Sequence, residues 1–270
     1  VSGNYCQLTN CSWAVDGRKI EKEVGIETIV INDFLAISYG IQSLDVNNPD
    51  QIAVLKHTDG SCPEPQAAVK AVVGPGTGLG LSYIAYHKGE YIPFSSEGGH
   101  SGLAPFDEES RNLRDFIAKK YNNIPGAELF VSGQGICNIY DYYREVKGLE
   151  SEGVFATIDA AERFDRPALI SRNAETNATC REIMELFVKM FAAYSSNIAC
   201  IFMPFGGLYL AGGTVIKNQY ILSENDLFMK TFEQNYKENI RKILNRIPVY
   251  IIKDYSISLY GAANGAVKLI

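Results

Sequence analysis

A seven-residue segment with four glycines, Gly74-Pro75-Gly76-Thr77-Gly78-Leu79-Gly80, separates two short apolar runs. The runs before and after it, Lys70 to Val73 and Leu81 to His87, have strand character, and a third run, Glu90 to Phe94, follows. Their spacing predicts an antiparallel meander of three strands. Because glycines let backbone amide groups curl around phosphate oxygens, the segment predicts a phosphate-binding loop. The alternative is a tight hairpin turn.

Two familiar phosphate motifs do not fit this segment. No Gly-Lys-Ser/Thr follows, as a P-loop requires, and no long helix begins there, as the dinucleotide fingerprint requires. A second set of glycines, Phe205-Gly206-Gly207 and Ala211-Gly212-Gly213-Thr214, brackets a predicted strand at 208–211. Glycines at a strand end permit the close approach of a flat ligand such as adenine, or close packing of a helix on the sheet.

Asp33 lies where an apolar run changes into a helical pattern. Residues 27–31 are predicted to form a short strand, and Phe34 to Ile41 regains helical spacing. A carboxylate at such a junction can accept a hydroxyl proton, which phosphoryl transfer to an alcohol requires. The alternative is that Asp33 only caps a helix at 34–43. Spacing alone leaves both interpretations open.

The segment Glu97-Gly98-Gly99-His100 follows the third strand of the meander. Its glycines would let Glu97 and His100 face one ligand, and a polyol is held by groups that accept and donate hydrogen bonds in pairs. A purely structural histidine is the alternative. Glu128 gives no signal by its own pattern and is typical of a surface residue.

Helical and strand patterns alternate along the chain. Apolar residues of Glu108 to Tyr121 fall three and four apart, on one face of a helix. Further predicted helices are residues 134–146, 156–164, 175–200, 224–244 and 259–270, and a further strand is 248–252. The pattern predicts an α/β or α+β protein with two lobes, with ligands at glycine-rich strand ends. The apolar helix at 175–200 is expected in the core, and a role in a homodimer interface stays open.

Composition limits the classes of partner and the cellular compartment that we expect for this chain. The net charge is −6 and the 25 Lys and Arg are dispersed, which disfavours nucleic acid and anionic membranes. No apolar stretch approaches the roughly 18 to 20 residues of a membrane span. Six scattered cysteines without CxxC spacing indicate reduced thiols in a cytosol-like compartment. The three histidines and the cysteines also lack the spacing of metal ligands, so no protein-built metal site is expected.

Taken together, the motifs resemble the bacterial-type glucokinase family, within the hexokinase, actin and Hsp70 superfamily. Seven segments match in order along nearly the whole chain: Leu8-Thr9-Asn10 with Trp13, Ile31-Asn32-Asp33-Phe34, Gly74 to Gly80, Glu97 to His100, Glu128 with Val131-Ser132-Gly133, Leu210 to Thr214, and Ile247-Pro248-Val249-Tyr250. Each motif is weak alone, and their common order makes the resemblance specific.

The resemblance implies a role for each matching residue. Asp33 resembles the catalytic base that accepts the proton of the sugar 6-hydroxyl. The residues that resemble ligands of the glucose hydroxyls are Asn32, Glu97, His100 and Glu128. Those that resemble phosphate-binding positions are Gly76, Thr77 and Gly78, and those that resemble the adenosine motif are Gly212 and Gly213.

The resemblance also implies an architecture and a reaction. The expected fold is the two-lobed actin-like (ribonuclease H-like) ATPase architecture with a ligand cleft between the lobes. Residues 1–43 and 255–270 would belong to the small α/β lobe, and 44–254 to the large lobe. The expected reaction is transfer of a phosphoryl group from ATP to glucose in the cytoplasm, with Mg²⁺ held mainly through the phosphates and water.

One family feature is not found. Members begin with a strand hairpin that contains an Asp-x-Gly-Gly-Thr phosphate loop, and this motif occurs nowhere in the 270 residues, which begin at Val1. We therefore expect a kinase that lacks the N-terminal part of its small lobe. Two alternatives stay open: a non-catalytic sugar or nucleotide sensor of the same superfamily, and a kinase for another hexose.

Overall fold

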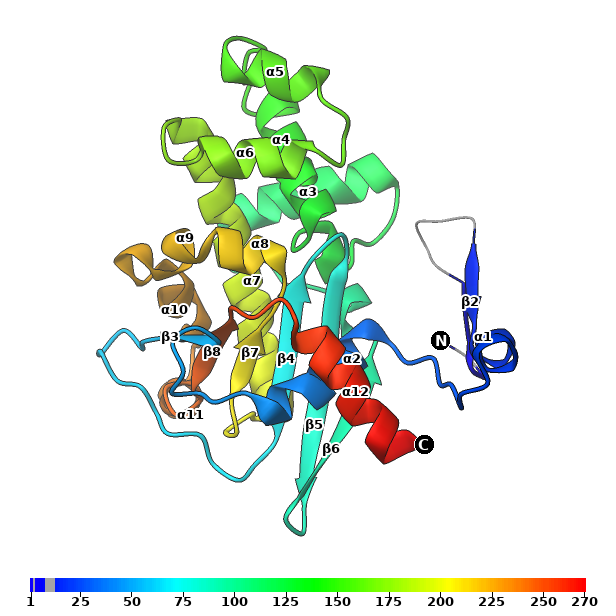
Figure 1. Ribbon diagram of the computed structural model, residues 1–270. Coiled ribbons are helices and arrows are strands. Elements are labelled where there is room, and N and C mark those ends of the chain that lie inside the picture. Colours follow the sequence, from blue (N-terminus) through cyan, green and yellow to red (C-terminus); the bar gives the residue numbers. More distant parts are fainter. Residues whose placement is uncertain (2, 8–12) are drawn as a thin grey trace.

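A mixed six-stranded sheet forms the centre of the computed structural model, which describes residues 1, 3–7 and 13–270. The matching segment Leu8-Thr9-Asn10 lies outside the described residues. The strand order is β3-β8-β7-β4-β5-β6. The strands are β3 (Ile52–Leu55), β4 (Lys70–Pro75), β5 (Leu79–His87), β6 (Glu90–Ser96), β7 (Leu208–Leu210) and β8 (Val249–Ile252) (Figure 1). Strands β4, β7 and β8 are parallel, and β4, β5 and β6 form the predicted antiparallel meander.

Side chains alternate between the two faces of this sheet. In β4, Ala71 and Val73 point to one buried cluster and Val72 points to the other. In β7, Tyr209 lies in the same cluster as Val72, and its neighbours lie in the opposite one. The period of two is that of a β-strand, and the central strands are apolar throughout because both faces are covered.

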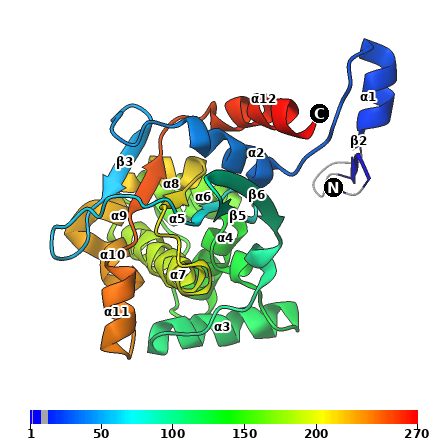
Figure 2. The ribbon, with the colours of Figure 1, turned by 90° about the horizontal axis from the view of Figure 1, so that it is seen from below.

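Helices cover both faces, as Figure 2 shows for α2, α12 and α7. The helices are α1 (Gly17–Val24), α2 (Asp33–Gly40), α3 (Glu108–Tyr121), α4 (Gly133–Glu145), α5 (Val154–Ala160), α6 (Arg166–Asn173), α7 (Ala178–Phe202), α8 (Gly213–Lys217), α9 (Gln219–Ser223), α10 (Leu227–Phe232), α11 (Glu238–Leu244) and α12 (Ile257–Leu269). The helix predicted at Glu108 to Tyr121 has the predicted bounds. Its N-terminus is fixed by a capping box between Asp107 and Ser110.

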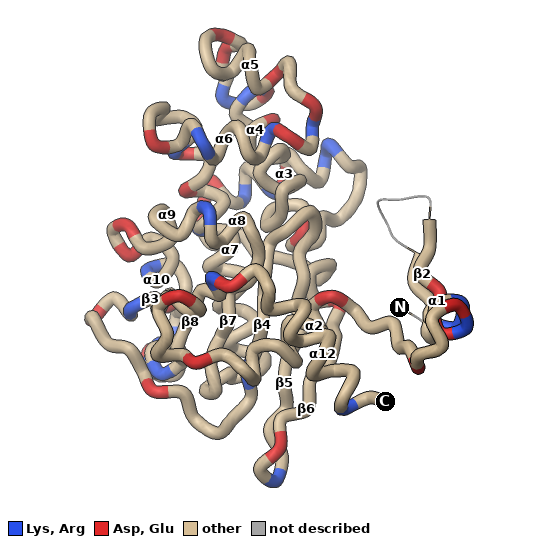
Figure 3. The backbone as a smooth tube through the Cα atoms, in the orientation of Figure 1, with Lys and Arg blue, Asp and Glu red and all other residues tan. Residues whose placement is uncertain are grey.

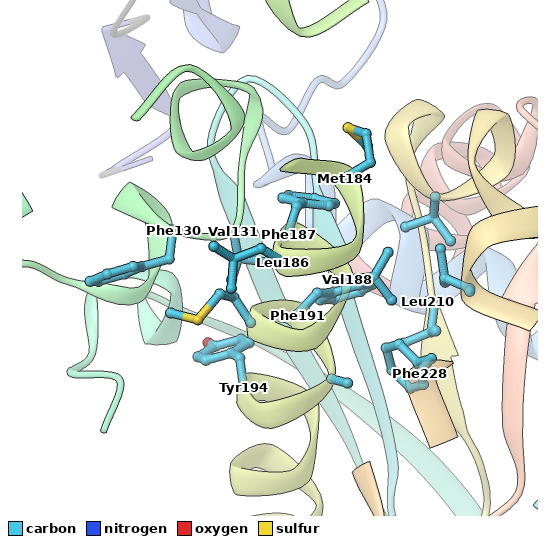
Figure 4. Packing of buried hydrophobic residues seen from close by; sticks show 14 of the residues in the cluster. Phe130, Val131, Met184, Leu186, Phe187, Val188, Phe191, Tyr194, Leu210 and Phe228 are labelled. Atoms are coloured by element: carbon cyan, nitrogen blue, oxygen red, sulfur yellow. The ribbon is translucent and has the colours of Figure 1, made fainter. Parts of the chain in front are cut away.

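Helix α7 forms the centre of the larger core, in agreement with the expectation for residues 175–200. Phe187, Phe191 and Tyr194 are each at most 1% exposed. Figure 4 shows these rings between the sheet and the neighbouring helices. Phe191 and Phe228 of α10 meet edge to face at a centroid distance of 5.4 Å. Burial of this helix stabilises the fold, because each fully buried apolar side chain contributes about 1.5–3 kcal/mol.

On the opposite face, α2 and α12 cross at very short range. A Cβ atom on Gly261 would lie 1.7 Å from the carbonyl oxygen of Ala36, and one on Gly40 would lie 2.3 Å from that of Ile257. Glycine at both positions allows the two helix backbones to touch. Helix α12 therefore fixes the position of α2.

The first residues lie apart from this body. Strands β1 (Tyr5–Gln7) and β2 (Ala14–Asp16) form a hairpin followed by α1, and an extended segment connects them to α2 (Figure 1). The prediction of a strand at 27–31 is wrong. No described strand pairs with this segment, and its backbone instead bonds the side chain of Asn4, through the Thr28 carbonyl at 2.8 Å and the Val30 amide at 2.7 Å.

The prediction of one helix over 224–244 is also wrong, because the chain breaks between α10 and α11. Glu233 lies at the break with its side chain 10% exposed. Its Oε1 lies 2.8 Å from Nδ1 of the fully buried His57 and accepts a hydrogen bond from the Thr58 amide at 3.0 Å. Tertiary contacts with the loop after β3 thus interrupt a periodic local pattern.

This buried pair gives a testable stability effect. Burial alone would raise the pKa of the Glu233 carboxyl, but hydrogen bonds from His57 and Thr58 hold the pKa below its ordinary value of 4.5. We expect Glu233→Gln to lower the free energy of unfolding by about 3 kcal/mol at pH 7. The contribution is present above the unfolded pKa and disappears as pH falls through the lowered folded pKa, so the difference from wild type should shrink in acid.

Urea denaturation at several pH values measures this difference. Glu238→Gln is the matched control, since that carboxylate is exposed and forms an ion pair with Lys242 one helical turn away. Equal stability of Glu233→Gln and wild type at pH 7 would contradict the expectation.

Other properties of the described part of the chain bear on its partners. None of its helices is long and apolar enough to cross a membrane. The five cysteines in the described ranges are free thiols. Figure 3 shows Lys and Arg interspersed with Asp and Glu along the chain.

Candidate functional site

The predicted site residues gather at one edge of the sheet. This edge holds the carboxyl ends of the parallel strands β4 and β7 and of β6, and the beginning of β5. In open sheets with parallel strands, ligands bind outside the carboxyl ends of those strands. The segments Gly74 to Gly80 and Gly212-Gly213, Glu97 to His100 and the N-terminus of α2 lie at this edge. Phe205-Gly206-Gly207 lies at the opposite edge, because it precedes β7 and bonds the residues at the start of β4.

The segment Gly74 to Gly80 forms a tight hairpin turn between β4 and β5. Gly74 pairs with Gly80, and Pro75 with Leu79, so only Gly76, Thr77 and Gly78 project beyond the ladder. The Gly76 amide donates to the Gly78 carbonyl at 2.8 Å. The hairpin and the loop interpretations are therefore compatible, because the turn itself presents Gly76 and Thr77 to a cavity.

Asn32, rather than Asp33, caps helix α2. The Oδ1 atom of Asn32 accepts hydrogen bonds from the amides of Phe34 at 3.0 Å and Leu35 at 3.1 Å. Asp33 is the first helical residue and its side chain is exposed, with one short-range contact to the Phe34 amide at 3.0 Å. The alternative that Asp33 serves as the cap is thus wrong, and its carboxylate stays accessible in the first turn, where a helix stabilises negative charge.

Phe34 positions Asp33 against the glycine-rich hairpin. A Cβ atom on Gly80 would lie 1.8 Å from the Phe34 ring, and one on Gly74 would lie 3.0 Å from it. Ser82 on β5 donates a hydrogen bond to the Phe34 carbonyl at 3.0 Å. The glycines of this segment therefore also make room for the ring that holds the N-terminus of α2 beside β5.

Glu97 and His100 lie together at the end of β6. Glu97 Oε2 and His100 Nε2 are 3.9 Å apart, and the two side chains are 90% and 66% exposed. Gly99 between them packs on the hairpin, because a Cβ atom there would lie 1.9 Å from the Leu79 carbonyl oxygen. Both side chains are therefore largely open to solvent and accessible to a ligand.

Glu128 is joined directly to the hairpin. Its Oε2 accepts a hydrogen bond from the Leu79 amide at 2.9 Å, and a Cβ atom on Gly78 would lie 2.5 Å from that oxygen. The Ala127 amide donates to the Ser101 carbonyl at 2.7 Å, which places Glu128 next to His100. The default interpretation of Glu128 as a surface residue is wrong, because the side chain is half-buried at the site.

A cavity of about 600 Å³ opens on the other side of the hairpin, between it and helices α4, α6 and α8. Three predicted site residues line it: Gly76, Thr77 and Gly213. Gly212 precedes Gly213 and packs closely on the hairpin. Its φ is 100°, and a Cβ atom there would lie 2.9 Å from the Pro75 carbonyl oxygen. The Gly133 amide at the start of α4 donates to the Gly76 carbonyl at 2.9 Å, which ties α4 to the turn.

Most of the cavity wall could not be found from the sequence. The residues that no motif marked are Gln134, Ile136, Cys137, Arg163, Phe164, Pro167, Ala168, Ser171, Lys217 and Asn218. They come from three helices and a loop that meet only in the folded chain. Arg163 and Lys217 are its charged residues, and no Asp or Glu in the described ranges lines it, so the cavity suits an anion.

No cluster of His, Cys, Asp and Glu among the residues described has the arrangement of a metal site.

Comparison with known proteins assigns the family. The sequence profile of the Glucokinase family matches residues 1–268. A glucokinase of Nostoc sp. is 33% identical over 282 residues, which cover all of this chain and 80% of that protein.

Solved structures agree with this assignment. The crystal structure of a glucokinase from an Antarctic psychrotroph has a TM-score of 0.79 at 25% identity, and the match covers 99% of this chain and 77% of that one. A ROK family glucokinase from Streptomyces griseus, solved with glucose and AMPPNP, has a TM-score of 0.59 at 16% identity over 93% of this chain and 71% of that one. The chain therefore belongs to the glucokinase family and is a sugar-phosphorylating kinase with the two-lobed actin-like fold.

Proposed function

We propose that this protein transfers the γ-phosphoryl group of ATP to the 6-hydroxyl of glucose. The observation that supports this most strongly is the position of the glycine-rich hairpin. It separates an anion-suited cavity of about 600 Å³ from a group of exposed hydrogen-bonding side chains that includes Asp33. The Streptomyces griseus kinase, solved with glucose and AMPPNP, supports the same two ligands.

The nucleotide would occupy the cavity, with its phosphates at Gly76, Thr77 and Gly78. These residues present backbone groups, and a side chain at Gly78 would displace the Glu128 carboxylate from its hydrogen bond with the Leu79 amide. Gly213 and Thr214 would lie along the adenosine. Mg²⁺, held by the phosphates and water, would neutralise the charge of the triphosphate.

The sugar would bind on the opposite side of the hairpin, at Glu97, His100 and Glu128. Carboxylate and imidazole groups accept and donate the paired hydrogen bonds that adjacent hydroxyls require. The Oδ1 atom of Asn32 is engaged in capping α2, so its amide NH₂ group is the part available to a hydroxyl. Specificity for glucose over other hexoses depends on this set.

The proposed chemistry requires one proton acceptor. Asp33 takes the proton of the 6-hydroxyl as that oxygen forms a bond to the γ-phosphorus, while the bond from the γ-phosphorus to the β,γ-bridging oxygen breaks and ADP leaves. Backbone amides of the hairpin meet the developing charge. The rigid first turn of α2, capped by Asn32, holds the carboxylate in place.

We also propose that residues 1–43 and 255–270 belong to the small lobe and 44–254 to the large lobe. The close contact of α2 with α12 supports grouping these two segments. Free thiols and the absence of a membrane-spanning helix among the described residues support the cytoplasm as the compartment.

Changes at the sugar side should act on sugar binding first. We expect Glu97→Gln and His100→Ala each to raise KM for glucose by roughly ten- to hundredfold, because each removes a hydrogen bond that involves a charged or strongly polar group. KM for ATP should change much less. Steady-state kinetics with the full-length protein measures both constants, and mannose and glucosamine as substrates test the choice of hexose.

The matched control is Glu90→Gln, which removes an exposed carboxylate at the far end of the same strand. It should leave both constants unchanged. A larger rise in KM for ATP than for glucose in the Glu97 and His100 variants would contradict the proposed sugar site.

A further inference from the structure

Arg163 and Phe164 occupy adjacent positions in the cavity wall between α5 and α6. The Phe164 side chain is 80% exposed although it is large and apolar. An exposed aromatic ring at the wall of a cavity gains from a flat ligand that covers it.

The guanidinium of Arg163 is fixed in orientation. Its Nη1 lies 2.9 Å from Oδ2 of Asp141, and its Nη2 donates to Oδ1 of Asn138 at 3.1 Å. Both partners are on α4, and Asn138 is also bonded by the Tyr121 hydroxyl at 3.0 Å. With these N–H groups bonded to α4, the group still offers its planar face, on which aromatic rings stack well.

The two positively charged residues of the cavity differ in whether a nearby carboxylate compensates their charge. Arg163 is compensated by Asp141, whose side chain is only 12% exposed. Lys217 on α8 has no carboxylate within ion-pair distance in the described part of the chain. An anionic group of a ligand is therefore attracted to Lys217 and to the hairpin amides more than to Arg163.

We propose that Arg163 and Phe164 form a stacking plate for the nucleobase, and that this plate gives the kinase its preference for purine over pyrimidine nucleoside triphosphates. Asp141 and Asn138 act as positioning residues, because they hold the guanidinium without contacting the base. The inference rests on the proposed use of a nucleoside triphosphate and adds the residues that select its base. A purine offers the larger ring system for stacking.

The test compares ATP, UTP and inorganic tripolyphosphate, which has phosphates but no base. In Phe164→Ala we expect KM for ATP to rise about tenfold or more, in line with the loss of base stacking. KM for UTP should rise less, so that the purine preference shrinks. The inhibition constant of tripolyphosphate and KM for glucose should stay at wild-type values.

Two further variants distinguish a plate from a phosphate contact. Arg163→Lys keeps the positive charge but loses the planar guanidinium. It should raise KM for ATP and leave the inhibition constant of tripolyphosphate unchanged. Lys217→Ala should weaken the binding of ATP, UTP and tripolyphosphate to a similar extent. Tyr236→Ala is the matched control, because it removes an aromatic side chain that is 88% exposed and does not line the cavity.

Two results would overturn the plate while leaving the proposed function intact: an unchanged KM for ATP in Phe164→Ala, or an equal loss of ATP and tripolyphosphate binding. A wild-type protein that phosphorylates sugar from a donor without a base, and not from ATP, would overturn the proposed donor and the plate with it. Thermal denaturation of each variant shows whether it is folded, and the high exposure of Phe164 makes loss of folding an unexpected result.

Discussion

Asp33→Asn is expected to lower kcat for glucose phosphorylation by about 10²- to 10⁴-fold, the usual contribution of a general base. The amide has nearly the same shape as the carboxylate but cannot accept the proton of the attacking hydroxyl. Because Asn32 caps α2, the substitution leaves the cap in place. KM for glucose and for ATP should therefore stay close to wild type, and a coupled assay together with glucose titration calorimetry separates binding from catalysis.

Asp50→Asn is the control for this variant. Asp50 is an exposed carboxylate in the loop before β3, outside the predicted site, and its loss should change neither constant. If Asp33→Asn retained kcat near the wild-type value, the assignment of Asp33 as the base would be wrong. If it abolished glucose binding instead, Asp33 would be a sugar ligand.

Gly261→Ala is expected to damage both folding and catalysis, although Gly261 lies inside α12, about one turn from its beginning at Ile257. Alanine normally stabilises a helix by about 1 kcal/mol relative to glycine. Here the new methyl group would lie 1.7 Å from the Ala36 carbonyl oxygen, and backbone on both sides cannot move aside as a side chain would. We expect the free energy of unfolding to fall by about 1–3 kcal/mol or more.

The same substitution should reduce kcat more than it changes KM for ATP. Separation of the helices moves α2, which begins with Asp33, whereas the cavity is built from α4, α6 and α8. A misplacement of about 1 Å in a catalytic group can cost roughly 10²-fold in rate. Denaturation and steady-state kinetics of the purified variant measure both effects.

Gly265→Ala in the same helix is the matched control. Its methyl group would meet the Tyr39 ring at 3.3 Å and the Ile31 side chain at 3.4 Å, contacts that small side-chain shifts can relieve. It should be close to wild type in both measurements. Equal behaviour of the Gly261 and Gly265 variants would contradict the role of the α2 and α12 contact.

Local patterns predicted the sheet meander and the helices at 108–121 and 175–200 well, because these elements depend on neighbours in sequence. Apolar alternation and Lys88-Gly89 are sufficient to specify the hairpin between β5 and β6. The run at 27–31 has the composition of a strand but no described strand beside it, and a strand needs a partner for its backbone hydrogen bonds. Composition cannot show whether that partner exists.

Some parts of the candidate site are likewise visible in local sequence, and others depend on tertiary packing. The hairpin and the Glu97 to His100 segment have glycines that only a close approach explains, so they are visible in the sequence. The cavity wall at Arg163 and Phe164 has no such signal, because the orientation of Arg163 depends on Asp141 and Asn138, which the folded chain brings near. The choice of Asn32 rather than Asp33 as the cap of α2 also needed the structure, since two adjacent polar residues before a helix are equally suited to that position.

Phosphorus-31 NMR of the full-length protein with glucose and Mg·ATP distinguishes phosphoryl transfer from ATP to glucose from binding without transfer. The proposed function predicts that ADP and glucose 6-phosphate appear in equal amounts as ATP is consumed, and that Asp33→Asn slows both together. A spectrum in which ATP persists in the presence of bound glucose would indicate a sensor. The appearance of ADP and free phosphate without a sugar phosphate would equally contradict the claim.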